Sequence, residues 1–117
     1  MAASDQAVIY HNPRCSTSRK TLELLRDNGF EPTVVEYLKT PPSRGELLKM
    51  IRDAGIDVRA AVRKRESRYA ELELADATDD ALLDAMAENP ILIERPFVIT
   101  PKGTRLARPI DAVREIL

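Results

Sequence analysis

The sequence contains one cysteine, one histidine and no tryptophan among its 117 residues. A single cysteine cannot form an intramolecular disulfide, and a free thiol is typical of a reducing compartment, so we expect a cytoplasmic protein. Soft metal ligands are too scarce for a structural zinc site, and we predict no metal. Aromatic residues make up 4% and the formal net charge is -1, a composition that does not favour nucleic-acid binding.

Long apolar stretches are also missing. No run of 18 apolar residues occurs, and residues 1–6 lack the basic segment and apolar core of a secretory signal. We therefore expect neither a membrane partner nor secretion. A hydrophobic content of 44% in a chain of this length suits one core, which predicts a single domain over residues 1–117.

The lone cysteine lies where a strand pattern gives way to a helix pattern. Residues 8–10 are short, β-branched and aromatic and run into Asn12-Pro13, whereas apolar residues recur at helical spacing over 17–28. A thiol just ahead of a helix N-terminus faces unpaired N–H groups and the positive end of the helix dipole, which favour thiolate. Most lone cysteines are small buried residues. The polar neighbours of Cys15 favour a nucleophile instead.

The remaining chain predicts a small α/β domain with a mixed sheet. Thr17 or Ser18 is suited to cap the first helix, and Gly29 to end it. A second strand over 33–37 completes a βαβ unit, which makes its two strands parallel. Residues 43–89 are then mostly helical, with a loop and one helical turn over 66–77. A hairpin of two strands over 97–108 and a closing helix follow, the latter with Pro109 in its first turn and Ile110, Val113 and Leu117 on one face.

This order, β-α-β, a helical insertion at about 43–89, then β-β-α, resembles the thioredoxin and glutaredoxin architecture with its four-stranded mixed sheet. The fourth position of the usual Cys-x-x-Cys is Ser18, so any adduct on Cys15 must be resolved by an external thiol.

Five blocks of sequence are similar to the glutaredoxin-coupled arsenate reductases, the ArsC family. They span nearly the whole chain: His11-Asn12-Pro13-x-Cys15-x-Thr17-Ser18-Arg19; Tyr37-Leu38 with Pro41-Pro42-Ser43; Val58-Arg59-Ala60 with Arg63-Lys64; Asn89-Pro90-Ile91-Leu92-Ile93-x-Arg95-Pro96; and Thr100-Pro101-x-Gly103-Thr104-Arg105-Leu106-x-Arg108-Pro109. Two residues beside the cysteine depart from the pattern. Ser16 stands where the best-known branch has glycine, and Arg14 adds a cation before the nucleophile.

The resemblance implies a cytoplasmic enzyme that reduces arsenate to arsenite with glutathione as co-substrate and glutaredoxin as partner, without a tightly bound cofactor. It implies further that Cys15 is the nucleophile and that three arginines, Arg63, Arg95 and Arg108, bind the oxyanion. Guanidinium groups suit both tasks, because they bind oxyanions in bidentate fashion and stabilise a neighbouring thiolate.

Each of these residues also has an ordinary structural interpretation. Arg63 lies in the basic string Arg63-Lys64-Arg65, which is typical of a solvated helix end, whereas Arg95 and Arg108 precede prolines in apolar surroundings. By the resemblance, His11 and Ser18 support the thiolate. They also suit a loop-capping histidine and a helix cap.

Two other functions fit the same fold. A thioredoxin-like regulator or binding module would dock on a partner and would not need the arginines, and a general glutathione-dependent thiol reductase would act on mixed disulfides without arsenate. A cysteine-based phosphatase is excluded, because its phosphate loop needs an arginine six residues after the cysteine, where this chain has Thr21.

Overall fold

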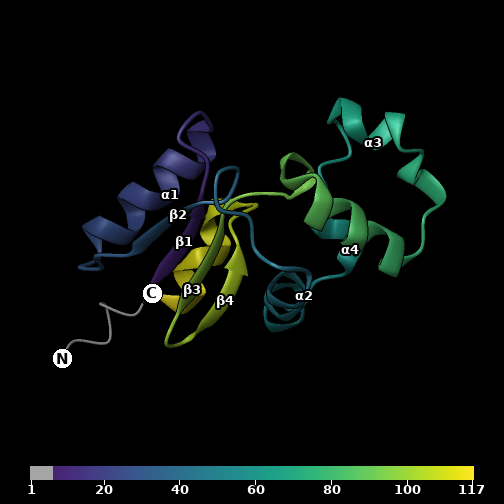
Figure 1. The fold of residues 1–117 in the computed structure, drawn as a ribbon. Coiled ribbons are helices and arrows are strands. Elements are labelled where there is room, and N and C mark those ends of the chain that lie inside the picture. Colours follow the sequence, from purple (N-terminus) through teal and green to yellow (C-terminus); the bar gives the residue numbers. More distant parts are fainter. Residues whose placement is uncertain (1–6) are drawn as a thin grey trace. The chain divides into compact units, whose positions relative to one another are not determined.

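The computed structural model describes residues 7–117, whose contacts divide the chain into two units (Figure 1). One unit comprises the chain up to Thr40 together with Arg95–Leu117, and the other comprises Pro41–Glu94. The prediction of one domain over 1–117 with a helical insertion at about 43–89 is not tested by this division and stays a prediction. No helix within residues 7–117 is both long and apolar enough to span a bilayer.

The first unit is built on a four-stranded mixed sheet in the order β2-β1-β3-β4. Strand β1 pairs in parallel with β2, and β3 pairs antiparallel with both β1 and β4. The helix α1 (Ser16–Asp27) forms the crossover between the two parallel strands. This arrangement confirms the predicted mixed sheet, with its strands at β1 (Val8–His11), β2 (Thr33–Glu36), β3 (Phe97–Thr100) and β4 (Gly103–Leu106).

Helix α1 begins one residue earlier than predicted, at Ser16, with Cys15 as its N-cap residue in an extended conformation. The prediction that Thr17 or Ser18 caps this helix was wrong. The Ser18 hydroxyl is instead bonded to His11 and to the backbone N–H of Asn12, so it serves the preceding loop. The end of α1 is as predicted, because Gly29 follows the C-cap with a φ of 86°, which favours glycine.

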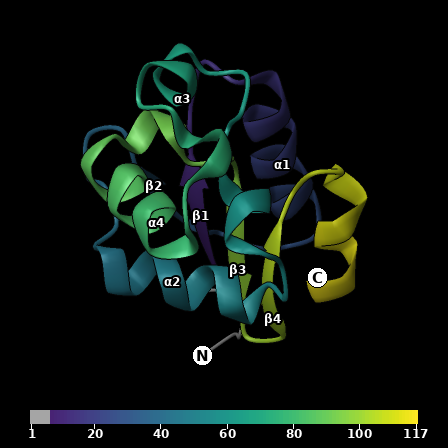
Figure 2. The same cartoon turned by 90° about the vertical axis from the view of Figure 1, so that its right-hand side faces the viewer.

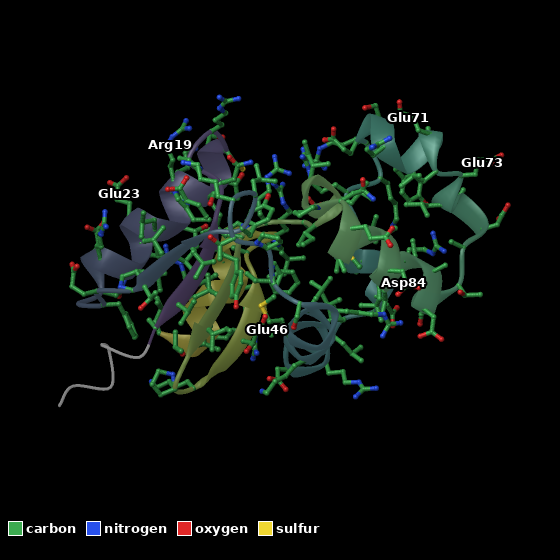
Figure 3. All side chains as sticks on the ribbon, in the orientation of Figure 1. Arg19, Glu23, Glu46, Glu71, Glu73 and Asp84 are labelled. Atoms are coloured by element: carbon green, nitrogen blue, oxygen red, sulfur yellow. The ribbon has the colours of Figure 1, made fainter. Side chains whose placement is uncertain are left out.

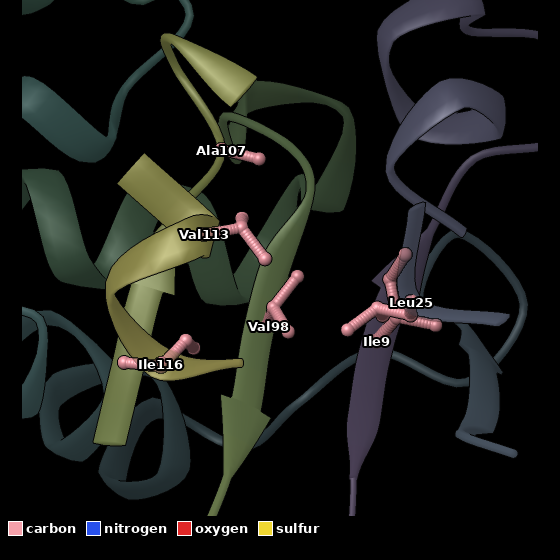
Figure 4. Packing of buried hydrophobic residues seen from close by; sticks show 6 residues of the cluster. All are labelled: Ile9, Leu25, Val98, Ala107, Val113 and Ile116. Atoms are coloured by element: carbon pink, nitrogen blue, oxygen red, sulfur yellow. The ribbon is translucent and has the colours of Figure 1, made fainter. Parts of the chain in front are cut away.

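One face of the sheet carries the core of this unit (Figure 4). Helix α1 and the C-terminal 3-10 helix η5 (Ile110–Ile116) lie on the same side of the strands (Figure 2). Their apolar side chains meet those of β1 and β3, because alternate strand residues face this side. The fully buried members are Ile9, Leu25, Val98, Ala107, Val113 and Ile116.

The closing helix differs from the prediction. It is a 3-10 helix, and Pro109 is its N-cap residue rather than part of its first turn. With about three residues per turn, residues three apart share a face. Val113 and Ile116 are therefore the buried pair, while Leu117, expected on that face, is only partly buried.

The second unit is helical. Helix α2 (Arg44–Asp53) starts at the predicted capping box, in which Ser43 and Glu46 exchange hydrogen bonds, and α4 (Asp79–Glu88) is capped by Thr78. The Arg44 side chain joins α2 to α4 through an ion pair of 2.7 Å with Asp84, which is labelled in Figure 3. The other elements are η2 (Val58–Ala61), α3 (Ser67–Glu71), η3 (Leu74–Asp76) and η4 (Pro90–Leu92), so the segment 66–77, predicted as loop with one helical turn, holds two short helices.

Candidate active site

The loop between β1 and α1 presents Cys15 in a fixed turn. The Cys15 N–H donates a hydrogen bond of 3.0 Å to the Asn12 carbonyl oxygen, and the Arg14 N–H donates one of 3.0 Å to the Asn12 side chain. From α1, the Arg19 guanidinium (Figure 3) donates a hydrogen bond of 2.8 Å to the carbonyl oxygen of Pro13. Hydrogen bonds within the loop and from Arg19 of the following helix thus fix the conformation of the loop.

The environment of the sulfur favours thiolate. Burial raises the pKa of the Cys15 thiol, but hydrogen bonding from the backbone N–H groups of Ser18 and Thr17 and the charges of Arg95 and Arg108 outweigh it, so the net pKa lies below the ordinary value. The Arg108 guanidinium reaches the sulfur directly, with Nη2 at 3.8 Å from Sγ. The predicted position of Cys15 ahead of a helix is therefore confirmed, and its role as the nucleophile stays a prediction.

The pairing of β3 with β4 explains why Arg95 and Arg108 lie together. Phe97 is opposite Leu106 in this antiparallel pair, so Arg95, two residues before β3, and Arg108, two residues after β4, meet at the same end of the sheet. There, Arg108 Nε donates a hydrogen bond of 2.9 Å to the Arg95 carbonyl oxygen. The Arg95 side chain is only 8% exposed. Both arginines precede a cis proline.

His11 and Ser18 form a buried hydrogen bond beside the same loop. The His11 Nδ1 and Ser18 Oγ atoms are 2.6 Å apart, and His11 is 7% exposed. Burial lowers the pKa of His11; Glu36 opposes this effect, and the cations of Arg19 and Arg26 add to it. The neutral ring is favoured at pH 7, so the structure offers the hydrogen bond to Ser18, rather than a ring charge, for a supporting role.

Arg63 belongs to the other unit, and its surroundings contradict the reading as a solvated helix end. Its side chain is 13% exposed, donates a hydrogen bond of 3.0 Å to Glu66, and has its Nε at 3.6 Å from Glu94 Oε1. Its neighbours Lys64 and Arg65 are exposed, as that reading expects. The role of Arg63 as an oxyanion ligand stays a prediction.

Two residues that hold the loop were not singled out from the sequence. Asn12 accepts the Arg14 and Cys15 backbone N–H groups, and Arg19 binds the Pro13 carbonyl. Their position within the block from His11 to Arg19 was the one signal that could have pointed to them.

The lowered thiol pKa predicts the pH dependence of alkylation. Only the thiolate reacts with iodoacetamide. We therefore expect the pH at which the alkylation rate of Cys15 is half-maximal to lie below that of free cysteine, so that Cys15 still reacts at lower pH. Replacing Arg108 by Gln removes a cation next to the sulfur and moves the midpoint upward. Mass spectrometry of the alkylated protein across a pH series measures both values. A wild-type midpoint at or above that of free cysteine would contradict this account.

Comparison with known proteins gives a consistent picture. The profile of the ArsC family matches residues 10–116. The chain is 60% identical over 111 residues to an arsenate reductase of Escherichia coli, covering 93% of this chain and 79% of that protein. It is 46% identical to the uncharacterized protein YfgD of Escherichia coli K12, covering 96% and 97%. Among solved structures, an arsenate reductase from Vibrio cholerae superposes with a TM-score of 0.91 at 49% identity, covering 97% of this chain and 98% of that one.

The fold defines an α/β protein of the thioredoxin-like class with a thiol at the N-terminus of α1, and the superposition confirms the predicted fold class. The family match extends over nearly the whole chain, including the loop of Cys15 and the two arginines beside it, Arg95 and Arg108. The chain belongs to the ArsC family.

Proposed function

We propose that this protein is an arsenate reductase that converts arsenate to arsenite by nucleophilic attack of Cys15 on arsenic. The observation that carries the proposal is the contact of the Arg108 guanidinium with the Cys15 sulfur, 3.8 Å away, in a thiol whose pKa is lowered. The proposal is also supported by the similarity of the chain to arsenate reductases, which are 57–60% identical to it over most of its length.

The arginines give the oxyanion a binding site next to its nucleophile. Arsenate carries one or two negative charges near neutral pH, and a guanidinium binds two of its oxygens at once, whereas lysine offers a point charge. Arg95 and Arg108 supply this positive charge beside Cys15, and Arg63 is proposed as the third ligand. The same charges lower the thiol pKa and attract the anion that the thiolate attacks.

Reduction requires a second thiol, which we propose to be glutathione. Cys15 is the one cysteine of the chain. In the net step, the thiols of Cys15 and glutathione each give up one electron, arsenic(V) gains two and becomes arsenic(III), and one arsenate oxygen leaves as water with the two thiol protons. Cys15 and glutathione end as a mixed disulfide. A glutaredoxin thiolate then attacks the glutathione sulfur and releases the Cys15 thiolate.

This chemistry also places the protein in a cell compartment. Glutathione and reduced glutaredoxin are maintained in the cytoplasm, where free thiols persist. We therefore propose a cytoplasmic enzyme with no tightly bound cofactor.

A coupled assay tests the proposed function. Purified protein is mixed with glutathione, glutathione reductase, glutaredoxin and NADPH, and absorbance at the NADPH band is followed before and after arsenate is added. We expect NADPH oxidation to depend on arsenate and on both glutathione and glutaredoxin, with arsenite as the product. NADPH oxidation with a glutathione mixed disulfide but not with arsenate would assign a general thiol reductase instead. Absence of both activities, with a stable protein complex, would favour a regulator.

A further inference from the structure

A cavity opens beside the loop that presents the thiol, on the side of the parallel strands. Its volume is about 380 Å3, within the roughly 300–1,000 Å3 range of small-molecule sites. Two of its walls are the ends of β1 and β2, where His11 and Glu36 are register partners. The carboxyl ends of neighbouring parallel strands are a common place for ligand binding in α/β proteins. The third wall is the loop formed by Asn12, Pro13 and Arg14, directly before the nucleophile.

The charged groups around this cavity are two cations and one anion. Arg14 is exposed, and no carboxylate within residues 7–117 forms an ion pair with its guanidinium. Lys39 Nζ is 3.5 Å from Glu36 Oε1, with most of the lysine side chain in solvent. Apolar contact is offered by Pro13 and by Leu38, which is 44% exposed. Neither Arg14 nor Lys39 has a part in the oxyanion site described above.

We propose that this cavity binds the thiol co-substrate, with Arg14 and Lys39 as ligands of its carboxylates and Glu36 as the ligand of its ammonium group. Glutathione has two carboxylates, one ammonium and a short apolar thiol arm, which match the two cations, the anion and the apolar wall. The inference rests on the proposed use of glutathione. It gives a function to Arg14, which departs from the family pattern.

Steady-state kinetics with glutaredoxin and arsenate saturating provides the first test. We expect Arg14→Ala and Lys39→Ala each to raise the KM for glutathione about two- to fivefold, because each removes one solvent-exposed ion pair with the ligand. The KM for arsenate stays within about twofold, because the oxyanion ligands are intact. Lys20→Ala is the matched control, since it removes an exposed cation from α1 outside this cavity. An unchanged KM for glutathione, or a raised KM for glutaredoxin in its place, would overturn the proposal.

A second measurement is independent of turnover. S-methylglutathione cannot react with arsenic or with disulfides, so its binding is read as slower alkylation of Cys15 by iodoacetamide. We expect protection in the wild type and in Lys20→Ala, and a loss of protection in Arg14→Ala and Lys39→Ala. The diethyl ester of S-methylglutathione, which lacks both carboxylates, gives no protection. Protection that persists in Arg14→Ala and Lys39→Ala refutes the subsite. If protection depends on both residues but the protein does not reduce arsenate, the subsite stands and only the proposed function is refuted.

Discussion

Replacing Cys15 by serine lowers arsenate reduction by at least about 10³-fold, as is typical when the nucleophile of covalent catalysis is removed. A serine hydroxyl at the same position is almost fully protonated near pH 7, and oxygen cannot form the disulfide on which electron transfer to arsenic depends. No other thiol is present in the sequence to take over the reaction. The coupled assay measures the loss directly.

The control for this substitution is Ser16→Ala at the adjacent, exposed position. Because α1 begins at Ser16 and its backbone is unchanged by alanine, we expect activity within about threefold of the wild type. Thermal unfolding of both variants should resemble that of the wild type, since Cys15 forms no disulfide. Retention of more than a tenth of the activity in Cys15→Ser would mean that the thiol is not the nucleophile.

Replacing Arg108 by alanine gives the second large effect. It removes the cation at 3.8 Å from the Cys15 sulfur and takes away a charged donor for the oxyanion. Loss of one partner of a buried charge pair typically costs about 2–5 kcal/mol, and this pair is partly buried, so we expect a loss near the lower end, roughly 30-fold in kcat/KM for arsenate. Arg108→Lys retains the charge without the planar fork, so we expect an intermediate loss.

Arg105 provides the matched control for Arg108, because it is an arginine of the neighbouring strand β4 and pairs with Glu115 at 2.8 Å in an exposed ion pair. We expect Arg105→Ala to keep kcat/KM within about twofold, since exposed pairs contribute little. Equal losses in Arg105→Ala and Arg108→Ala would show that a general loss of positive charge, rather than a specific ligand, is responsible.

Local signals in the sequence predicted the elements that local chemistry determines. The apolar run before Asn12 and the glycine at position 29 marked β1 and the end of α1, and the Ser43-Glu46 capping box marked the start of α2. These features depend on residues within one or two turns of each other. Pattern reading therefore sufficed for the strand before Cys15 and the helix after it.

The sequence did not show which polar side chains would find partners outside their own turn of chain. Ser18 has the chemistry of a helix cap, but His11 binds its hydroxyl across the loop. Arg63 has the sequence surroundings of a solvated cation, but it pairs with Glu94, far along the chain. Nothing local distinguishes a cation that will find such a partner from one that stays in water. The resemblance to a family, rather than periodicity, was what singled out Arg95 and Arg108.

The position of Cys15 at the first boundary of α1 has a consequence for the catalytic cycle. Most helices begin on a neutral hydroxyl or amide or on a carboxylate that takes no part in chemistry, whereas this one begins on the residue proposed as the nucleophile. When the sulfur bonds to arsenic or to another sulfur, its negative charge disappears and the positive end of the α1 dipole loses an adjacent anion. Release of the Cys15 thiolate restores that anion. The regenerated protein is therefore also the form in which the N-terminus of α1 is best stabilised by an adjacent negative charge.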